Sequence, residues 1–217
     1  MALAIFDLDE TLIDGDCASL WAQHMVDLQW IDGDSFLARE QELMRLYGRG
    51  ELAMEDYMAF TLSPLVGRTP EEVAYVVGPF VEDVIEPLIF SDAMRCVAEH
   101  RAAGDRILVI SASAVFLVEA IAERLGIGEV LAIDLEQQHG CYSGKTRGVL
   151  TYREGKVTRL QHWLGEQAES LEGAFFYSDS RNDLPLLSQV SNPRAVNPDE
   201  ALRAHAQENG WPILAWH

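Results

Sequence analysis

Three short clusters of polar residues in this sequence each follow directly on a run of apolar residues. The clusters are residues 7–11 after 3–6, residues 111–113 after 107–110, and residues 178–183 after 174–177. They contain carboxylates and hydroxyls, which can attack a phosphate ester, bind a divalent cation and hold the charge of the phosphoryl group. The sequence therefore contains the groups that phosphoryl transfer requires, provided that the fold brings them together.

The pair Asp7 and Asp9 in the first cluster suits a covalent route. A carboxylate that attacks phosphorus forms an acyl-phosphate, so that one difficult displacement becomes two easier ones. We expect Asp7 to be this nucleophile, because a cation beside it would keep it ionised at neutral pH. Asp9 would protonate the leaving alkoxide and then take a proton from the attacking water. For that role its carboxyl group must face away from any bound cation.

The charge on the transferring oxygens must be met by hydrogen-bond donors and cations. We expect Ser111, Lys156 and Asn182 to bind the phosphate, together with the backbone amides after Asp7. The formal net charge is −19, from 35 acidic and 16 basic residues, so Lys156 is important to any anion site in this chain. The same negative field repels nucleic acids and anionic membranes, and we predict neither as a partner.

Each of these features also has an ordinary explanation. An Asp-x-Asp pair after a strand is common, paired serines often cap helices, and a lone lysine is usually solvated. Asp179 and Asp183 would be favourable at the start of a helix for electrostatic reasons alone. Only their joint occurrence at one edge of a sheet favours an active site over these separate explanations.

The elements that would position these residues alternate along the chain. Apolar runs at 3–6, 107–110, 130–133 and 174–177 are typical of buried parallel strands, and helical stretches separate most of them. Ser91 is expected to cap one helix, residues 114–125 form another, and residues 197–200 open a third. This pattern predicts an α/β fold with a doubly wound parallel sheet, whose ligands bind at the carboxyl ends of the strands.

Residues 16–87 interrupt this alternation, because they show helix signals and no strand pattern. Asp34 is expected to cap a helix that runs to Tyr47. Residues 69–72 combine a capping box with proline at the first helical position. We therefore predict a core domain of residues 1–15 and 88–217 and a helical cap domain of residues 16–87. Residues 138–156, with their spaced glycines, predict a β-hairpin.

Taken together, DLDET (7–11), Ser111, Lys156 and SDSRND (178–183) resemble the signatures of the haloacid dehalogenase-like hydrolases. The helical stretch resembles the cap of their phosphoserine-phosphatase-like branch, subfamily IB. The resemblance implies a Rossmann-like core and a Mg²⁺-dependent phosphomonoesterase with an aspartyl-phosphate intermediate. It also implies that the Asp7 carboxylate, the Asp9 backbone carbonyl and Asp179 bind Mg²⁺. Asp183 is either a further ligand or, as we favour, a residue that orients these groups from behind.

The substrate is expected to be a small phosphorylated metabolite. Asp16 lies where phosphoserine phosphatases carry an acid for the amino group, but the arginine that would bind the carboxylate has no clear counterpart. Residues 151–160 and 195–203 resemble a bacterial subgroup with histidinol-phosphatases among its members, so histidinol phosphate is our first expectation. A cap with Asp16, Trp21, Tyr57 and Phe60 would suit its amine and imidazole.

Other readings of the same residues remain. Phosphoserine is the alternative substrate, and a phosphotransferase or phosphomutase would use the same site with an alcohol as the acceptor. A catalytically silent binding module would be expected to lack one of the key residues, and none is missing here.

Three cysteines, Cys17, Cys96 and Cys141, are odd in number and have no CxxC spacing. They indicate reduced thiols, and the start of the chain lacks the pattern of a signal peptide. We expect a cytoplasmic monomer or homodimer with a place in amino-acid biosynthesis.

Overall fold

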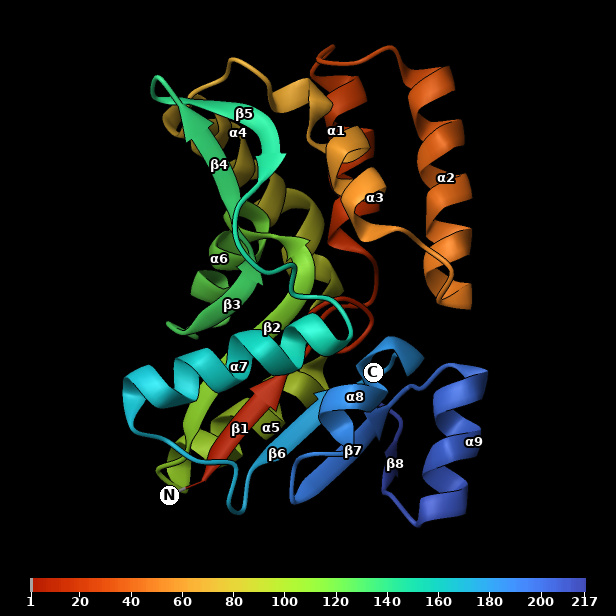
Figure 1. The fold of residues 1–217 in the computed structure, drawn as a ribbon, viewed down its shortest axis with the longest axis vertical. Coiled ribbons are helices and arrows are strands. Elements are labelled where there is room, and N and C mark those ends of the chain that lie inside the picture. The colour runs from red at the N-terminus through yellow and green to blue at the C-terminus, as the bar shows by residue number, and fades with distance from the viewer. Residues whose placement is uncertain (1) are drawn as a thin grey trace.

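The computed structural model describes residues 2–217 and contains a six-stranded sheet in the order β3-β2-β1-β6-β7-β8 (Figure 1). Every neighbouring pair in it is parallel. The strands are β1 (Leu3–Phe6), β2 (Arg106–Ala114), β3 (Val130–Ile133), β6 (Phe175–Ser178), β7 (Asn192–Val196) and β8 (Ile213–Leu214). The predicted doubly wound α/β fold is therefore confirmed, with β1 in the middle of the sheet.

Helices cover both faces of this sheet, as a parallel sheet requires. The helices α5 (Ser91–Ala102) and α6 (Val115–Arg124) pack on one face. The opposite face is covered by α7 (Glu154–Gln167), α8 (Leu184–Leu187) and α9 (Glu200–Asn209). Successive residues of β1 point to opposite sides, so Phe6 lies in the first core and Ile5 in the second. Figure 1 shows α7 crossing in front of the sheet and α5 behind it.

Residues 17–88 contain only helical elements and lie between β1 and α5. We call this segment the helical insertion. It comprises α1 (Cys17–Asp27), α2 (Gly33–Arg49), α3 (Met54–Thr61), α4 (Pro70–Phe80) and three single turns, η1 (Ser63–Leu65), η2 (Val81–Ile85) and η3 (Glu86–Leu88). The predicted capping box begins α4, where the Thr69 hydroxyl accepts from Glu72 N at 3.1 Å and the Glu72 carboxylate accepts from Thr69 N at 2.8 Å.

The predicted hairpin is present as β4 (Leu135–Gln138) and β5 (Cys141–Thr146), which pair antiparallel. It begins earlier than expected and ends before the loop that leads to α7. Tyr142 in β5 makes backbone hydrogen bonds to the insertion: its carbonyl accepts from Gly67 N at 3.0 Å, and its N–H donates to Arg68 O at 2.9 Å. The hairpin therefore attaches the second half of the chain to the helical insertion (Figure 1).

Several expected helix boundaries were wrong. Ser91 does not cap α5, because it is the first helical residue and its hydroxyl donates to His217 O at 3.0 Å. Asp34 lies inside α2, which starts at Gly33 and continues to Arg49. Gly48 does not end this helix, since it keeps a helical backbone. Gly50 ends it with φ of 69°, a left-handed conformation that glycine adopts without strain.

Two site residues also lie in elements other than those expected. The strand that contains residues 107–110 continues through Ser111 to Ala114, so Ser111 is part of β2 and does not close it. Lys156, at the end of the stretch 138–156 that predicted a hairpin, lies in the first turn of α7. Within residues 2–217, no helix is both long enough and apolar enough to cross a bilayer.

Strands β7 and β8 were not predicted. The first contains Pro193, a residue type that argues against a strand inside a sheet. Asn192 N donates to Ala174 O on the β6 side, whereas Ala195 N donates to Pro212 O on the β8 side. Residue 193 therefore faces β8, and the pairing with β8 begins only at Ala195. The N–H that proline lacks would have no partner at this position, so the strand tolerates it.

Candidate active site

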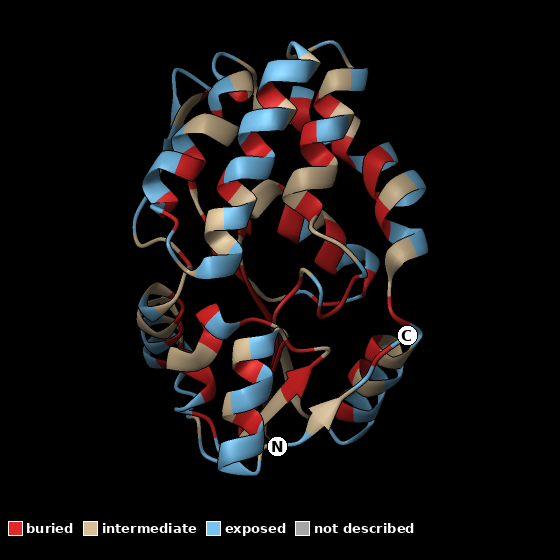
Figure 2. Cartoon of the chain, turned by 90° about the vertical axis from the view of Figure 1, so that its right-hand side faces the viewer, coloured by how far each residue is buried: buried red, intermediate tan, exposed pale blue. Residues whose placement is uncertain are grey.

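Asp7 lies at the carboxyl edge of the sheet, where β1 ends. Its N–H donates to Tyr177 O at 2.9 Å, which extends the pairing of β1 with β6 by one residue. The chain then turns sharply, because Leu8 O accepts from Leu12 N at 2.8 Å. In Figure 2 the buried residues continue from the sheet into the loops at this edge. The turn places Asp7 beside the loop that follows β6, as the sequence predicted.

Lys156 joins Asp7 to the β6 loop. Its Nζ donates to Asp7 Oδ1 at 3.0 Å and to the Asp183 carboxylate at 2.8 Å, and its side chain is 1% exposed. Ser178 Oγ also donates to Asp183, at 2.7 Å. Buried charges are retained when they are paired and hydrogen-bonded in this way. The structure thus brings together Asp7, Lys156 and Asp183, which are far apart in the sequence.

The acids in this group have perturbed pKa values. Burial raises the pKa of Asp7 to about 8; the charge of Lys156 opposes this shift, and the charges of Asp183 and Asp9 add to it. Burial alone would lower the pKa of Lys156, but the charges of Asp183 and Asp7 outweigh it and hold the pKa above its usual value. Lys156 therefore stays charged beside Asp7.

Asp179 is held by Thr11, at the other end of the first cluster. The Thr11 hydroxyl donates to Asp179 Oδ1 at 3.1 Å and accepts from Asp179 N at 3.1 Å. Burial, with the charges of Asp7 and Asp183, raises the pKa of Asp179 well above its usual value. The like charges of Asp7 and Asp179 repel each other, so a divalent cation bound by both carboxylates would be favourable here.

The Asp9 side chain is fixed by two donors. Its Oδ1 accepts from Cys17 N at 2.7 Å and its Oδ2 accepts from Ser113 Oγ at 2.9 Å. Ser113 received no role from the sequence, although it belongs to the second cluster. Ser111 is fully buried, and its Oγ accepts from Ser113 N at 3.1 Å. The cavity wall at this strand is formed by Ala112 and Ser113, with Ser111 beneath it.

Asn182 was expected to bind phosphate, but both ends of its amide are engaged elsewhere. Its Nδ2 donates to Tyr47 O in the helical insertion at 3.1 Å. Its Oδ1 accepts from Arg153 Nε at 3.2 Å and from the Tyr152 hydroxyl at 3.3 Å. In this structure Asn182 therefore joins the sheet edge to the insertion.

A cavity of about 250 Å³ opens at this edge, between the sheet and the helical insertion. Six of its lining residues are acids, and none is lysine, arginine or histidine. The acids are Asp7, Asp9, Glu10, Asp16, Asp179 and Asp199. The insertion contributes apolar and aromatic groups, among them Met44, Tyr47, Met54 and Tyr57, and Asp16 lies directly before its first helix. An anionic cavity of this kind favours cationic ligands.

Asp16 is the N-cap of α1, and its Oδ1 accepts from Ser19 N at 2.7 Å. Burial raises the pKa of Asp16 to about 7, and the charge of Asp9 adds to this. Of the aromatic residues expected around it, Tyr57 does line the cavity. Phe60 stacks on Phe36 with ring centroids 4.3 Å apart, so it packs within the insertion.

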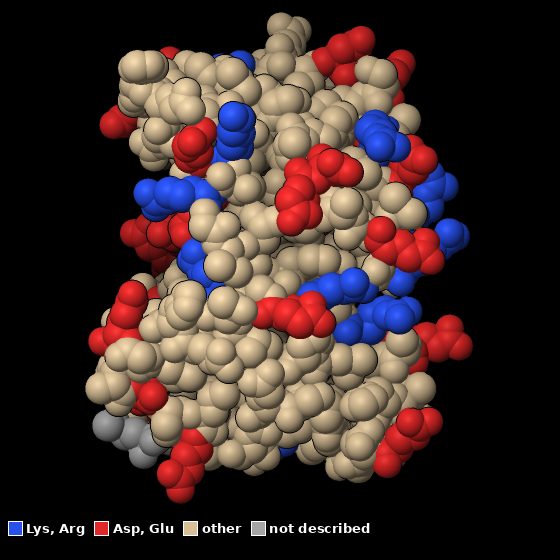
Figure 3. Space-filling model, in the orientation of Figure 1, with Lys and Arg blue, Asp and Glu red and all other residues tan. Residues whose placement is uncertain are grey.

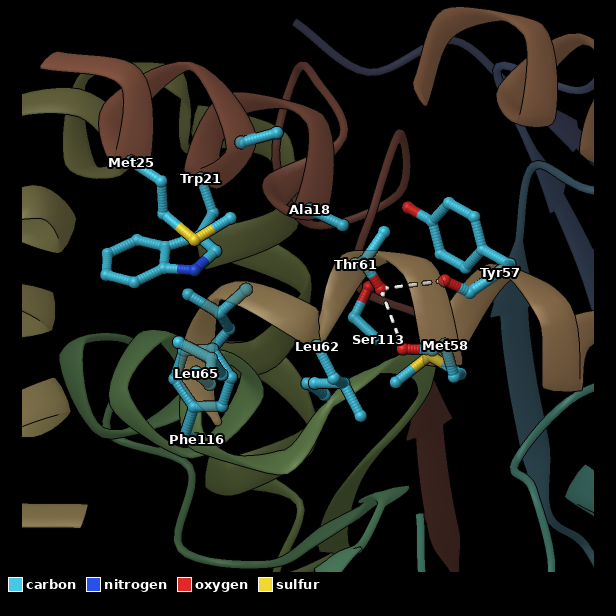
Figure 4. A pocket seen from close by; sticks show the side chains of 13 residues that line it. Ala18, Trp21, Met25, Tyr57, Met58, Thr61, Leu62, Leu65, Ser113 and Phe116 are labelled. Carbon is cyan, nitrogen blue, oxygen red and sulfur yellow. Dashed lines mark hydrogen bonds between the residues drawn. The ribbon is translucent and has the colours of Figure 1, made fainter. Parts of the chain in front are cut away.

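Trp21 lines a second, apolar pocket of about 20 Å³ beside the cavity (Figure 4). This pocket shares Ala18, Tyr57 and Ser113 with the larger one. Figure 4 shows the Thr61 hydroxyl directed at the backbone carbonyls of its own helix rather than into open space. The apolar pocket has room for about one water molecule. It is therefore a small packing gap between the insertion and the core, too small for a substrate.

The donor set fits Mg²⁺ better than a softer metal. Within residues 2–217, no three His, Cys, Asp or Glu side chains are grouped so that they could hold a metal ion by themselves. The expected set contains two carboxylates, from Asp7 and Asp179, and the backbone carbonyl of Asp9. Mg²⁺ commonly binds few protein oxygens and completes its octahedral shell with water. The residues present therefore fit this cation.

Comparison with known proteins gives the family. Residues 4–188 match the model of the haloacid dehalogenase-like hydrolases. The chain belongs to this family. A histidinol-phosphatase from Neisseria meningitidis serogroup C (strain 8013) is 39% identical over 216 residues, which cover 98% of this chain and 97% of that protein. The phosphoserine phosphatase SerB1 of Mycobacterium tuberculosis is 29% identical over 217 residues, covering 98% of this chain and 70% of that protein.

Solved structures of other proteins superpose on this member of the family. A protein of unknown function from Bordetella pertussis Tohama I superposes with a TM-score of 0.91 at 37% identity, covering 98% of this chain and 97% of that one. A substrate-bound phosphoserine phosphatase superposes with a TM-score of 0.72 at 18% identity, covering 98% and 92%, a similarity that shows the fold alone. The expected family and enzyme class, a haloacid dehalogenase-like phosphomonoesterase, are confirmed.

Proposed function

We propose that this phosphomonoesterase hydrolyses the phosphate ester of a small cationic metabolite, with histidinol phosphate as the best candidate. The observation that carries the proposal is the composition of the cavity, which is lined by six carboxylates and by no basic side chain. Catalysis is proposed to depend on Mg²⁺ and to proceed through an aspartyl-phosphate at Asp7.

In the proposed reaction, Asp7 attacks phosphorus while Lys156 stays charged beside it at 3.0 Å. A carboxylate oxygen of Asp7 forms the new bond to phosphorus, and the bond from phosphorus to the substrate oxygen breaks. Asp9 gives a proton to that oxygen, held for the purpose by Cys17 N and Ser113 Oγ. Water then attacks phosphorus, the bond between phosphorus and Asp7 breaks to release inorganic phosphate, and Asp9 takes a proton from the attacking water.

Asp7, the Asp9 carbonyl and Asp179 are the groups that would hold Mg²⁺. When bound, the cation would offset the negative charge that nucleophile and phosphate share. Asp183 accepts from Lys156 and Ser178 and would orient the lysine from behind. We propose that Ser111 acts through Ser113, whose N–H it fixes at 3.1 Å.

The charges on the two candidate substrates differ, and this favours histidinol phosphate. Its ammonium and imidazole groups would meet Asp16 and Tyr57, whereas the carboxylate of phosphoserine would enter a wall with no basic residue. Two like charges 4 Å apart near a protein surface repel by about 4 kcal/mol at an effective dielectric of 20. The 39% identical histidinol-phosphatase supports the same choice.

A substrate panel tests this proposal. We expect kcat/KM to be highest for histidinol phosphate, lower for phosphoethanolamine, which carries an amine without a ring, and lowest for phosphoserine. A preference for phosphoserine would contradict the charge argument. Free phosphate released in water alone separates hydrolysis from phosphoryl transfer, since a transferase would need an added alcohol.

We also propose that residues 16–87, which contain nearly all of the helical insertion, act as a cap on a core of residues 1–15 and 88–217. This proposal is supported by the cavity, which lies between the two parts of the chain and is lined by residues of both. We further propose that the protein acts in the cytoplasm. Cys17, Cys96 and Cys141 are all free thiols, as is usual in a reducing compartment.

A further inference from the structure

We infer that Arg153 is a positioning residue that holds the tip of the helical insertion over the cavity. By holding the tip there, it sets the selectivity of the enzyme for the leaving group of its substrate. The tip is the end of α2, residues 47–50. Arg153 Nη2 donates to Gly50 O, and Arg153 Nε donates to Asn182 Oδ1 at 3.2 Å. The inference rests on the proposed function only in that selectivity is read through turnover.

The clasp has a second part, which Asn182 provides. The amide of Asn182 donates to Tyr47 O at 3.1 Å, and the rings of Tyr47 and Tyr152 lie 5.6 Å apart. Arg153 and Asn182 thus bind carbonyls at both ends of the last turn of α2. These contacts join residues more than 100 positions apart in the sequence, so they hold the insertion against the core.

Arg153 is held in an unusual backbone conformation to make this contact. Its φ of 51° and ψ of −121° lie in a region that L-residues rarely adopt, so the backbone is strained at this position. It precedes α7, yet its side chain does not cap that helix. Its guanidinium instead turns to the insertion, with its carbon 5.2 Å from the Tyr152 ring centre. Strain of this kind persists where surrounding contacts over-determine it.

The position of Arg153 connects three parts of the site. Tyr47 and Gly48 of the tip line the cavity. Asn182 lies in the same short loop as Asp179 and Asp183. The Arg153 carbonyl accepts from Lys156 N at 3.0 Å at the start of α7. On the face shown in Figure 3, Lys and Arg side chains lie across the middle of the molecule, at the level of the boundary between the insertion and the sheet.

Gly50 offers a way to break the clasp without touching Arg153. A Cβ at Gly50 would collide with Arg153 Nη2. The φ of Gly50 is 69°, so alanine there also introduces left-handed strain. Gly210 ends α9 with φ of 67° and has no other atom within 4 Å of a built Cβ, so Gly210→Ala has the same strain without the collision. It is the matched control.

The experiment compares Arg153→Gln, Gly50→Ala and Gly210→Ala with the wild type, after circular dichroism has confirmed their folds. Two substrates are used: histidinol phosphate, and p-nitrophenyl phosphate as a substrate without cationic groups. We expect the first two variants to lose about tenfold in kcat/KM on histidinol phosphate, mainly through KM, since one or two charge-assisted hydrogen bonds are lost. Activity on p-nitrophenyl phosphate should change less than about twofold, and Gly210→Ala should match the wild type.

Limited trypsin digestion gives a second readout that does not depend on turnover. Arg49 is exposed and precedes Gly50, so cleavage after it reports release of the tip. We expect faster cleavage there in Arg153→Gln and Gly50→Ala and no change in Gly210→Ala.

Unchanged tryptic cleavage and selectivity in both variants would overturn the inference. An equal loss on both substrates would also overturn it, because it would place the effect at Lys156 and not at the tip. If the wild type does not hydrolyse histidinol phosphate, the proposed substrate fails, and trypsin cleavage still decides whether the clasp exists. If one of the two variants does not fold, the other carries the test, since each breaks the same contact from a different side.

Discussion

Replacement of Lys156 by methionine tests the buried ion pairs at the centre of the site. The side chain of Lys156 is 1% exposed and those of its partners Asp7 and Asp183 are 7% and 2% exposed. Methionine fills similar space but leaves two carboxylates without their cation. Removing one partner of a buried pair costs about 3–5 kcal/mol, whereas breaking a surface pair costs about 1 kcal/mol or less.

The measurement is urea unfolding at pH 7 without Mg²⁺, together with phosphate release in its presence. We expect Lys156→Met to lower the free energy of unfolding by about 3 kcal/mol or more and to reduce kcat at least about a hundredfold. Lys145 is the other lysine of the chain and is exposed in β5, so Lys145→Met is the control. We expect its free energy of unfolding to change by less than about 0.5 kcal/mol.

A double variant separates charge from packing. Lys156→Met combined with Asp183→Asn removes one of the two unpaired carboxylates, while the amide oxygen still accepts from Ser178. It should regain more than about 1 kcal/mol of the lost stability but none of the activity. A loss below about 1 kcal/mol in the single variant, or a double variant no more stable than the single one, would refute the buried pairing described here.

Three further outcomes are expected. Asp7→Asn should fold normally by circular dichroism and lose essentially all phosphate release; substantial residual turnover would exclude the covalent route. Chelation with EDTA should abolish activity, Mg²⁺ should restore it and Ca²⁺ should not, because the longer and less regular coordination of Ca²⁺ misplaces the nucleophile; an enzyme indifferent to EDTA would contradict the metal assignment. The pKa of Asp16 rises from 3.8 to about 7 on folding, so its contribution to stability is present at low pH and is lost as pH rises through this window. Asp16→Asn should therefore be more stable than the wild type by about 1–2 kcal/mol at pH 8, after discounting the full shift for solvent screening, and equal to it near pH 4; equal stability at both pH values would contradict the burial of this carboxyl group.

Local signals predicted much of the fold because they act over a few residues. The capping box at Thr69 formed as expected, since it depends on groups three residues apart. The helix α9 begins within the predicted stretch 197–200, with Asp199 as its N-cap. The same signals misled where a neighbour competed: Asp32 took the N-cap position of α2 in place of Asp34. Strand β7 was missed, and it contains Pro193, which has no N–H to donate to a neighbouring strand. The strand tolerates this proline only because β8 begins to pair at Ala195, and the local sequence does not encode where β8 begins.

The candidate site was predictable where one motif supplied each residue and the sheet topology brought the motifs together. Asp7, Lys156 and Asp183 meet in this way. The amide of Asn182 and the guanidinium of Arg153 were not predictable, because their partners are carbonyls of the distant residues Tyr47 and Gly50. Any residue type presents a backbone carbonyl, so such contacts leave no trace in the pattern of side chains.

The central place of β1 has a consequence for biogenesis. Both neighbours of this strand, β2 and β6, are made about 100 and 170 residues later, as the pairings of Ala4 with Ile107 and Phe175 show. Contacts this distant in sequence slow folding, since a long loop must close before they form. During synthesis the apolar segment Leu3–Phe6 thus waits without partners while the whole helical insertion emerges from the ribosome. Asp7 is therefore translated 149 residues before Lys156, and its buried ion pair forms only after that much more of the chain has been made.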